Sequence, residues 1–117
     1  HQSDSHRILR HAVSLGWLDT ALVPYNHAGK FDHTIYRGFS VSWNQSALDS
    51  AIAEAVNAGM GISAMKACSA GPYSPVRGGT PTFPAGLSRV LDNPNIATIA
   101  VAMANFREVR ENTAVMA

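Results

Sequence analysis

Two apolar stretches decide the fold: Gly59-Met60-Gly61-Ile62-Ser63-Ala64-Met65-Lys66-Ala67, and Asn93-Pro94-Asn95-Ile96-Ala97-Thr98-Ile99-Ala100-Val101-Ala102-Met103-Ala104-Asn105. Each stretch follows a segment with helical periodicity, contains small or branched apolar side chains, and leads into a polar turn. Buried strands that alternate with helices are typical of a parallel α/β protein, in which ligand-binding loops follow the strands. The two stretches therefore predict an α/β fold.

The rest of the chain continues this alternation. We expect helices over 3–15, from 46 to a stop at Gly59, over 84–92 and from 105 onward; strands over 18–25, 61–67 and 96–103; and loops over 26–38 and 68–82. The side chains expected to be buried recur at helical spacing: Leu48, Ala51, Ile52 and Ala55, then Leu87, Val90 and Leu91, then Phe106, Val109, Thr113 and Met116. Both loops are long enough to be functional.

The starts of the helices have recognisable capping signals. Ser3 is a candidate N-cap, while Ser46-Ala47-Leu48-Asp49 and Asn105-Phe106-Arg107-Glu108 have the spacing of capping boxes. In such a box the first side chain accepts a hydrogen bond from a backbone N–H, and the carboxylate three residues later reaches back to the helix start. Pro84 suits the first turn of the third helix, where its missing N–H has no intrahelical partner to lose.

Composition narrows the class of protein. The 117 residues are 46% hydrophobic and 15% charged, which predicts one globular domain, and the net charge of +1 gives no basic patch for nucleic acid. Cys68 is the only cysteine, which excludes an internal disulfide and fits a reducing compartment. No apolar run reaches the ~18 residues of a membrane span. We expect a cytoplasmic protein with no nucleic-acid or membrane partner.

Three parallel strands joined by right-handed crossovers form a sector of a sheet with two unpaired edges. An eight-stranded barrel of ~250 residues removes both edges. The chain begins at His1-Gln2, close to a helix start, which suggests that upstream material is absent. We expect residues 1–117 to be a single domain, the C-terminal part of a (β/α)8 TIM barrel, with its edges covered by the missing barrel half or by a homo-oligomer.

Five pieces of the sequence, in order, resemble the aldo-keto reductases, in particular their bacterial single-domain branch. Leu18-Asp19 through Pro24-Tyr25-Asn26 is similar to the family's sixth strand, Gly59-Met60-Gly61-Ile62 through Met65-Lys66-Ala67 to its seventh strand, Leu87 through Asn105 to its seventh helix and eighth strand, and Glu108-Val109-Arg110-Glu111-Asn112 to its eighth helix. The resemblance covers essentially all 117 residues. It implies a TIM-barrel oxidoreductase that reduces aldehydes or ketones with NADPH and without a metal.

The resemblance also implies which part of the enzyme this chain supplies. In that family the catalytic Asp, Tyr, Lys and His come from the first four strands, so no catalytic residue is expected here. The cofactor-binding residues that the resemblance implies are Asn26, Met65, Lys66, Met103, Asn105, Arg107, Glu111 and Asn112. Backbone N–H groups at 104–106, at the start of the last helix, suit the cofactor's phosphates, because a helix N-terminus attracts anions.

The chain departs from the family at several cofactor positions. Leu22 stands where many members have Gln, and Met65 stands where many have an aromatic residue that stacks on the nicotinamide. Ala102 and Met103 replace a Lys or Gly and a Ser, and Glu108 replaces an Arg that grips the adenosine phosphate. These departures imply that NADPH binding is weakened or that NADH is accepted.

Two other functions remain open. The altered Leu22, Met65 and Glu108 favour a non-catalytic barrel that acts as a regulatory or partner-binding subunit. An unrelated phosphate-binding barrel lyase or isomerase is compatible with the fold alone.

Single residues also keep structural alternatives. Lys66 can instead be a structural lysine that extends to the barrel rim, and Asn26 can be a turn former. Glu111 and Asn112 can simply form the polar face of the last helix. Cys68 has no base partner nearby in the sequence and is interpreted as a packed thiol. Because His1, His6 and His11 are spaced by five, they fall on different helix faces, and we assign no metal site.

Overall fold

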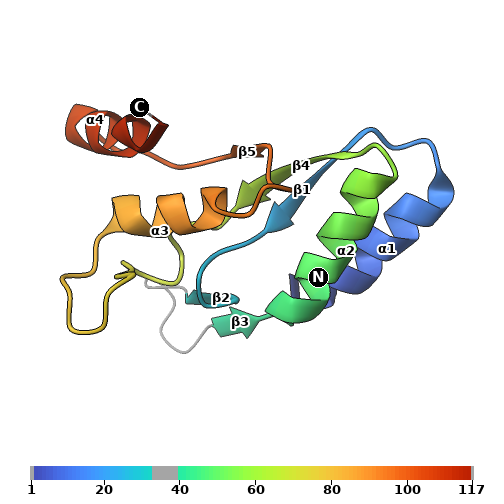
Figure 1. The fold of residues 1–117 in the computed structure, drawn as a ribbon, viewed down its shortest axis with the longest axis horizontal. Helices are drawn as coiled ribbons and strands as arrows, with labels where there is room; N and C mark the ends of the chain where they lie inside the picture. The colour runs from blue at the N-terminus through green and yellow to red at the C-terminus, as the bar shows by residue number, and fades with distance from the viewer. Residues whose placement is uncertain (1, 33–39, 117) are drawn as a thin grey trace.

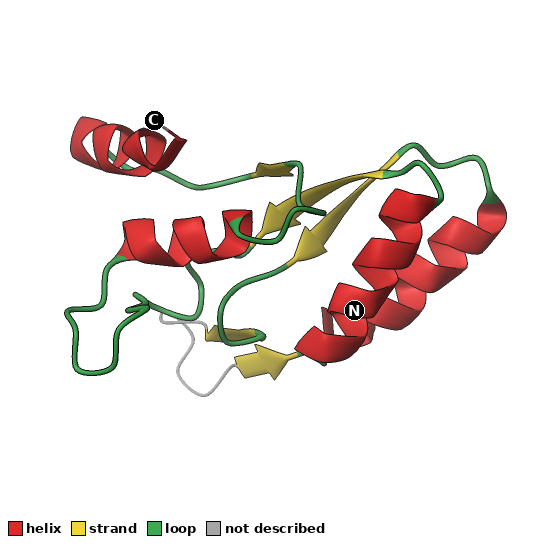
Figure 2. Ribbon diagram, in the orientation of Figure 1, coloured by secondary structure: helices red, strands yellow, loops and turns green. Residues whose placement is uncertain are grey.

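The computed structural model describes residues 2–32 and 40–116 (Figure 1). Its helices are α1 (Ser5–Leu15), α2 (Gln45–Asn57), α3 (Phe83–Leu91) and α4 (Phe106–Thr113), with short 3-10 helices η1 (Gln2–Asp4) and η2 (Ala114–Met116). Its strands are β1 (Thr20–Pro24), β2 (Lys30–Asp32), β3 (Ser40–Ser42), β4 (Gly61–Met65) and β5 (Thr98–Ile99). Figure 2 shows strands and helices following one another along the chain, which confirms the α/β prediction.

The main sheet has three parallel strands in the order β1-β4-β5. Neighbouring residues in the register share a face of the sheet, since side chains alternate along each strand. Val23 pairs with Ala64, and Ala64 with Ile99, on a face where Val23 and Ala64 are buried. Leu22 pairs with Ser63 on the other face, and Leu22 is 54% exposed. The sheet is therefore covered by helices on one face and exposed on the other.

The hydrophobic core lies between the covered face and the helices. The predicted stripe of α2 is fully buried: Leu48, Ala51, Ile52 and Ala55. It meets Ile62 and Ala64 of β4 in the same cluster of buried side chains. Leu87 and Val90 of α3 are buried as predicted, and Leu91 is half-buried.

Two of the predicted helix caps were wrong and two are confirmed. The N-cap of α2 is Asn44, two residues before the expected Ser46, because the side chain of Asn44 accepts the hydrogen bond from Ala47 N at 2.9 Å. The Asp49 carboxylate accepts from Tyr25 Oη instead of reaching back to the helix start. α1 begins at Ser5 with Asp4 at its N-cap, so Ser3 is not the cap. Pro84 lies in the first turn of α3, as expected.

The second confirmed cap starts α4. Asn105 Oδ1 accepts from Glu108 N at 3.0 Å, and the Glu108 carboxylate accepts from Ala104 N at 2.6 Å, next to the N-cap. These bonds are reciprocal as in a capping box, although the carboxylate accepts from the residue before the N-cap instead of from the N-cap itself. The expected buried side of this helix was wrong, since none of the eight described residues of α4 is buried and Phe106 is 86% exposed. α4 packs beside α3 and η2, away from the covered face of the sheet (Figure 1).

Strand lengths and one loop also differ from expectation. The last strand shrinks from 96–103 to Thr98–Ile99, although Ala97 N and Ala100 N still bond to Ile62 O and Ala64 O. The loop predicted over 26–38 contains β2, which pairs antiparallel with β3 and places Phe31 opposite Val41. The remainder of that loop, 33–38, lies outside the described residues. The loop over 68–82 is confirmed, with one isolated bridge between Tyr73 and Thr82.

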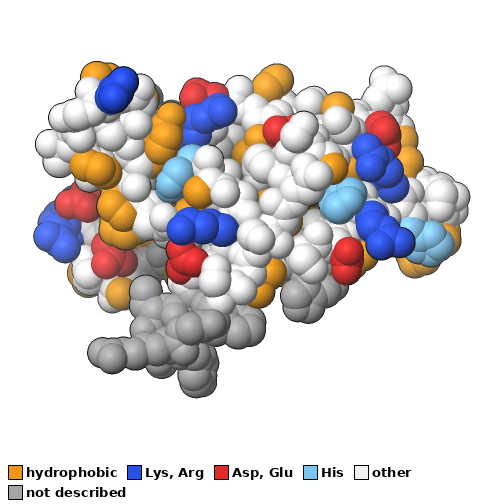
Figure 3. Space-filling model, turned by 90° about the horizontal axis from the view of Figure 1, so that it is seen from below, with side chains coloured by type: hydrophobic (Ala, Val, Ile, Leu, Met, Phe, Trp, Pro, Cys, Tyr) orange, Lys and Arg blue, Asp and Glu red, His pale blue; other side chains and the backbone are white. Residues whose placement is uncertain are grey.

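Two surface properties bear on function. Among the described residues, no helix is both long and apolar enough to cross a membrane. On the face seen in Figure 3, lysine and arginine side chains are interspersed with acidic ones over the surface. The charge on this face is therefore mixed.

Candidate functional site

The loops after β1 and β4 are joined by one buried side chain, that of Asn26, which is 1% exposed. Asn26 Nδ2 donates to the carbonyl oxygens of Lys30 and Lys66, at 2.7 and 2.9 Å. Its Oδ1 accepts from the backbone N–H groups of Ala28 and Gly29, at 3.1 and 2.9 Å. The side chain thus forms a turn and also fixes the β4 loop against it, which supports the turn-forming alternative for Asn26.

Lys66 has an unusual backbone conformation at the end of β4. Its φ of 63° lies in the left-handed region, which residues other than glycine rarely adopt. Its carbonyl oxygen accepts from Ser69 Oγ at 2.7 Å as well as from Asn26, so the loop holds the strained residue in place. Its ammonium nitrogen lies 4.1 Å from the centroid of the Phe31 ring, a cation–π contact with the β2–β3 hairpin.

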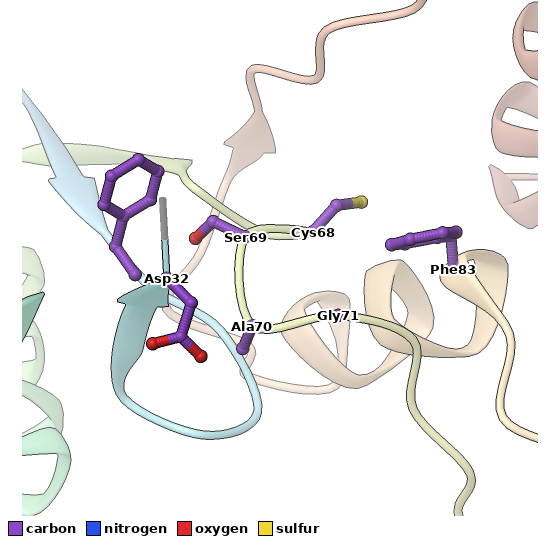
Figure 4. A pocket seen from close by; sticks show the side chains of 7 residues that line it. Asp32, Cys68, Ser69, Ala70, Gly71 and Phe83 are labelled. Atoms are coloured by element: carbon purple, nitrogen blue, oxygen red, sulfur yellow. The ribbon is translucent and has the colours of Figure 1, made fainter. Parts of the chain in front are cut away.

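A cavity near these loops has a volume of about 520 Å³. Its walls come from β2, the β4 loop and the start of α3: Phe31, Asp32, Cys68, Ser69, Ala70, Gly71 and Phe83 (Figure 4). In Figure 4 the thiol of Cys68 extends toward Phe83, and Asp32 lies on the opposite side of the loop. The cavity therefore borders the carboxyl end of β4.

The titratable groups of this cavity have defined protonation states. Asp32 accepts from Lys30 Nζ and from Ser40 Oγ, each at 2.7 Å, and these bonds lower the pKa of its carboxyl. Asp32 is therefore a carboxylate at neutral pH. Burial raises the pKa of the Cys68 thiol, so this group stays protonated at neutral pH. A neutral thiol is a poor nucleophile, which agrees with a packed role for Cys68.

A second cavity, of about 290 Å³, adjoins the first and shares Cys68 and Phe83 with it. Its other lining residues are Ala102, Arg107, Glu108, Glu111 and Asn112. Arg107, Glu111 and Asn112, which the sequence predicted as cofactor-binding residues, thus come together beside the loop after β4. We refer to the two adjoining cavities as the loop cavity and the α4 cavity.

The other predicted residues lie elsewhere. Asn105 caps α4. Met65 lines an apolar groove between α1 and β1, together with Ile8 and Leu22. Met103 lines a groove among α3, β5 and the C-terminal helices. The structure therefore divides the predicted cofactor residues among the α4 cavity, the joint between the two loops, and two grooves that flank the sheet.

A hydrogen-bonded group on the helix-covered side of the sheet was not predicted. Tyr25 Oη donates to Asp49 Oδ1 at 2.6 Å, and Asn93 Nδ2 donates to Tyr25 Oη at 3.0 Å. Burial, and secondly Asp49, raises the pKa of the Tyr25 hydroxyl. This group ties β1 to α2 and to the turn after α3. The Ser46-to-Asp49 spacing suggested a cap instead, and nothing in the sequence pairs residues so far apart.

His27 also lies in this region, and the sequence analysis assigned it no role. Its ring lies against that of Tyr73, with centroids 4.9 Å apart. Within the described residues its buried Nδ1 has no hydrogen-bond partner. Burial, and then the positive charges of Lys30 and Arg89, lower the pKa of this imidazole. His27 is therefore neutral at pH 7.

Comparisons with known proteins assign no function to this site. Comparison with protein-family models, with curated proteins and with solved structures finds no match to this chain. Among the residues that the structure describes, no three His, Cys, Asp or Glu side chains gather closely enough to hold a metal ion.

Proposed function

We propose that this chain is the cofactor-binding part of a cytoplasmic oxidoreductase of the aldo-keto reductase type, strands six to eight of a TIM barrel. In this proposal β1, β4 and β5 are the three strands, and a nicotinamide dinucleotide, NADPH or NADH, binds at their carboxyl ends. The observation that carries the proposal is the pair of adjoining cavities beside the loop after β4. TIM-barrel sites lie at this end of the strands, and phosphate sites often follow strands seven and eight.

The half-covered sheet supports the barrel. Parallel sheets are normally buried on both faces, whereas here the face of Leu22 is exposed. The chain has an accessible surface of 7366 Å² at a mass of 12.5 kDa. A closed monomer of that mass has roughly 6200 Å². A barrel half from the same polypeptide, or a second copy, covers such a face.

The residues present can be tested against the cofactor. Small-molecule and cofactor sites in general are clefts of about 300 to 1,000 Å³ with mostly apolar walls and a few polar groups. The loop cavity and the α4 cavity, at about 520 and 290 Å³, together fall in this range and are joined by the apolar Phe83. Arg107 and Asn112 would hold the adenosine end, and Lys66 would lie nearest the strands. The combined volume and the apolar Phe83 support a ligand of the size of a dinucleotide.

The chemistry follows from the cofactor when it is bound. A reduced nicotinamide supplies a hydride to the carbonyl carbon of an aldehyde or ketone while the carbonyl oxygen gains a proton, which gives the alcohol. None of the described residues is proposed as the proton donor, since Asp32 is ionised and the Tyr25 hydroxyl is bonded to Asp49. The resemblance places the donor in the first four strands of the barrel.

The test is direct binding of the reduced cofactors, followed by their fluorescence and by calorimetry. The proposal predicts saturable binding of at least one of NADH and NADPH below millimolar concentration. Ala102 lines the α4 cavity, so Ala102→Trp should reduce the affinity at least tenfold by filling it. Ala53 lies on the exposed face of α2, so Ala53→Trp is the matched control and should bind as the parent does.

Binding of neither cofactor would contradict the proposal. Binding that both tryptophan variants leave unchanged would also contradict it, because the site would then lie elsewhere.

A further inference from the structure

Residues 68–82 form a long loop between β4 and α3, and the part over 75–82 is exposed (Figure 1). The base of this exposed part is closed by Tyr73 and Thr82, whose backbones exchange hydrogen bonds of 2.9 and 2.8 Å. Thr82 is also the N-cap of α3. Residues 68–71, just before Tyr73, line the loop cavity. The position of Tyr73 therefore links the exposed part of the loop, the start of α3 and the wall of that cavity.

The side chain of Tyr73 packs against His27, which lies in the turn after β1. The ring centroids are 4.9 Å apart, and the ring planes are inclined by 36°. Both side chains face Gly86 near the start of α3, where an added Cβ would lie 3.7 Å from Tyr73 Cβ and 4.0 Å from His27 Nδ1. This ring contact therefore fastens the loop to the turn that Asn26 organises.

The surroundings of His27 do not suit a positively charged ring. An imidazolium carries an N–H on both nitrogens. The buried Nδ1 has no hydrogen-bond partner among the described residues, so it would become a donor without an acceptor. Burial, and then the positive charges of Lys30 in β2 and Arg89 in α3, lower the pKa of the ring. The start of α3 adds the positive end of a helix dipole beside Nδ1.

The negative charge nearest to this ring is already used. From α2, Asp49 lines the same small polar cavity as His27 and Tyr25. Its carboxylate accepts from Tyr25 Oη at 2.6 Å and from Asn93 Nδ2 at 3.4 Å. Within the described part of the chain, no acidic side chain bonds to the imidazole. An imidazolium is attracted to an aromatic face such as that of Tyr73, but the lowered pKa of His27 means that the unfavourable surroundings outweigh this attraction.

We propose that the ring contact of His27 with Tyr73 is a pH-sensitive latch, and that protonation of His27 releases Tyr73 and opens the loop over 68–82. Opening withdraws residues 68–71 from the wall of the loop cavity, so the cavity is complete at neutral pH and incomplete in acid. The closed loop is fully stable above the unfolded histidine pKa of about 6.5, and it loses stability as pH falls through the lowered folded value. The latch goes beyond the proposed function, because it needs no cofactor.

The experiment compares hydrogen–deuterium exchange of the protein and two variants at pH 7.5 and 5.0, without ligand. His27→Phe keeps a ring against Tyr73 and cannot be protonated. Exchange itself depends on pH, so the parent is compared with the variant at the same pH. The ratio of parent to His27→Phe exchange rates over 72–82 should rise at least about threefold from pH 7.5 to 5.0. Complete exclusion of the imidazolium from the closed loop would give a rise of about 30-fold.

The matched control replaces a histidine that is exposed on α1. His11→Phe should exchange over 72–82 as the parent does at both pH values. A ratio of parent to His27→Phe rates that is the same at both pH values would overturn the inference. So would a loss of the pH dependence in His11→Phe.

A titration of the parent followed by NMR guards against a loss of stability in His27→Phe. The ring of His27 should titrate below 6.5, and the amide signals of Tyr73 and Thr82 should shift with the same midpoint. A ring that titrates at 6.5 or above, or amide signals that do not follow it, would contradict the latch. Either failure leaves the proposed function as it stands, because neither measurement involves a cofactor.

Discussion

Helices α2 and α4 begin alike and pack differently. Each has an asparagine N-cap that accepts from a backbone N–H, at 2.9 Å for Asn44 and 3.0 Å for Asn105. α2 buries Leu48 completely against the covered face of the sheet, whereas Phe106 of α4 is 86% exposed. A cap is a local interaction, but burial depends on what lies across from the helix. The comparison shows that α2 is part of the fully buried core, whereas α4 is an exposed helix that lines the candidate site.

The largest expected effect contrasts one core residue with one exposed residue. Leu48→Ala should destabilise the protein by about 2 to 5 kcal/mol, because it leaves a cavity in a region with no exposed surface. Phe106→Ala deletes a larger side chain but should change stability by less than about 0.5 kcal/mol. Urea denaturation measures both. Equal losses would mean that α4 is packed in solution, and the contrast would fail.

Asn26→Ala tests whether the loops around the cavities contribute to global stability as the buried core does. Removing the amide leaves the carbonyl of Lys66 and the N–H of Gly29 without this partner, so a loss of about 2 to 4 kcal/mol is expected. Asn112→Ala, in the wall of the α4 cavity, should cost less than about 0.5 kcal/mol. If Asn26→Ala were as mild as Asn112→Ala in thermal unfolding, the loops would not depend on this joint.

The two caps give a matched pair of smaller effects. Asn44→Ala should lower global stability by about 1 kcal/mol, since α2 unfolds with the core. Asn105→Ala should leave global stability nearly unchanged and instead raise amide exchange within α4, because a weakly packed helix opens by itself. Exchange measured residue by residue distinguishes these outcomes. A global loss from Asn105→Ala would show that α4 folds cooperatively with the core.

Tyr25 gives an effect of similar small size that depends on pH. Its hydroxyl pKa is raised in the folded protein, so stability is full below the unfolded pKa of about 10 and falls as pH rises through the folded value. Tyr25→Phe should cost about 1 kcal/mol at pH 8 by removing the bond to Asp49, with the difference narrowing above pH 10. Denaturation at pH 8 and 11 checks it. A difference that stays constant with pH would show that the Tyr25 hydroxyl does not titrate differently on folding.

The features predicted correctly from the sequence are those that depend on the spacing of residues close together in the chain. The stripe Leu48 to Ala55, the strand at Gly61 and the capping box at Asn105 were all predicted from residues a few positions apart. The β2–β3 pairing was missed because its alternating pattern is only three residues long in each strand. The exposure of Phe106 was missed because helical spacing gives an apolar stripe without showing whether anything covers it.

The candidate site was predicted in part for the same reason. Arg107, Glu111 and Asn112 follow one another on a single helix, so their meeting in the α4 cavity was within reach of the sequence. Phe31 and Phe83 come from a hairpin and a helix start that only the tertiary fold brings to the cavities. Glu108 both caps α4 and lines the α4 cavity, and only the tertiary structure shows the second role.

The most direct test of cofactor binding beside α4 is hydrogen–deuterium exchange of the protein with and without saturating NADH. Protection is predicted in 66–71 and 102–112, the segments that border the two cavities, and no change is predicted in α1 and α2. Protection confined to α1, α2 or the groove beside β1, or no protection anywhere with the ligand shown to be bound, would contradict the assignment of the site.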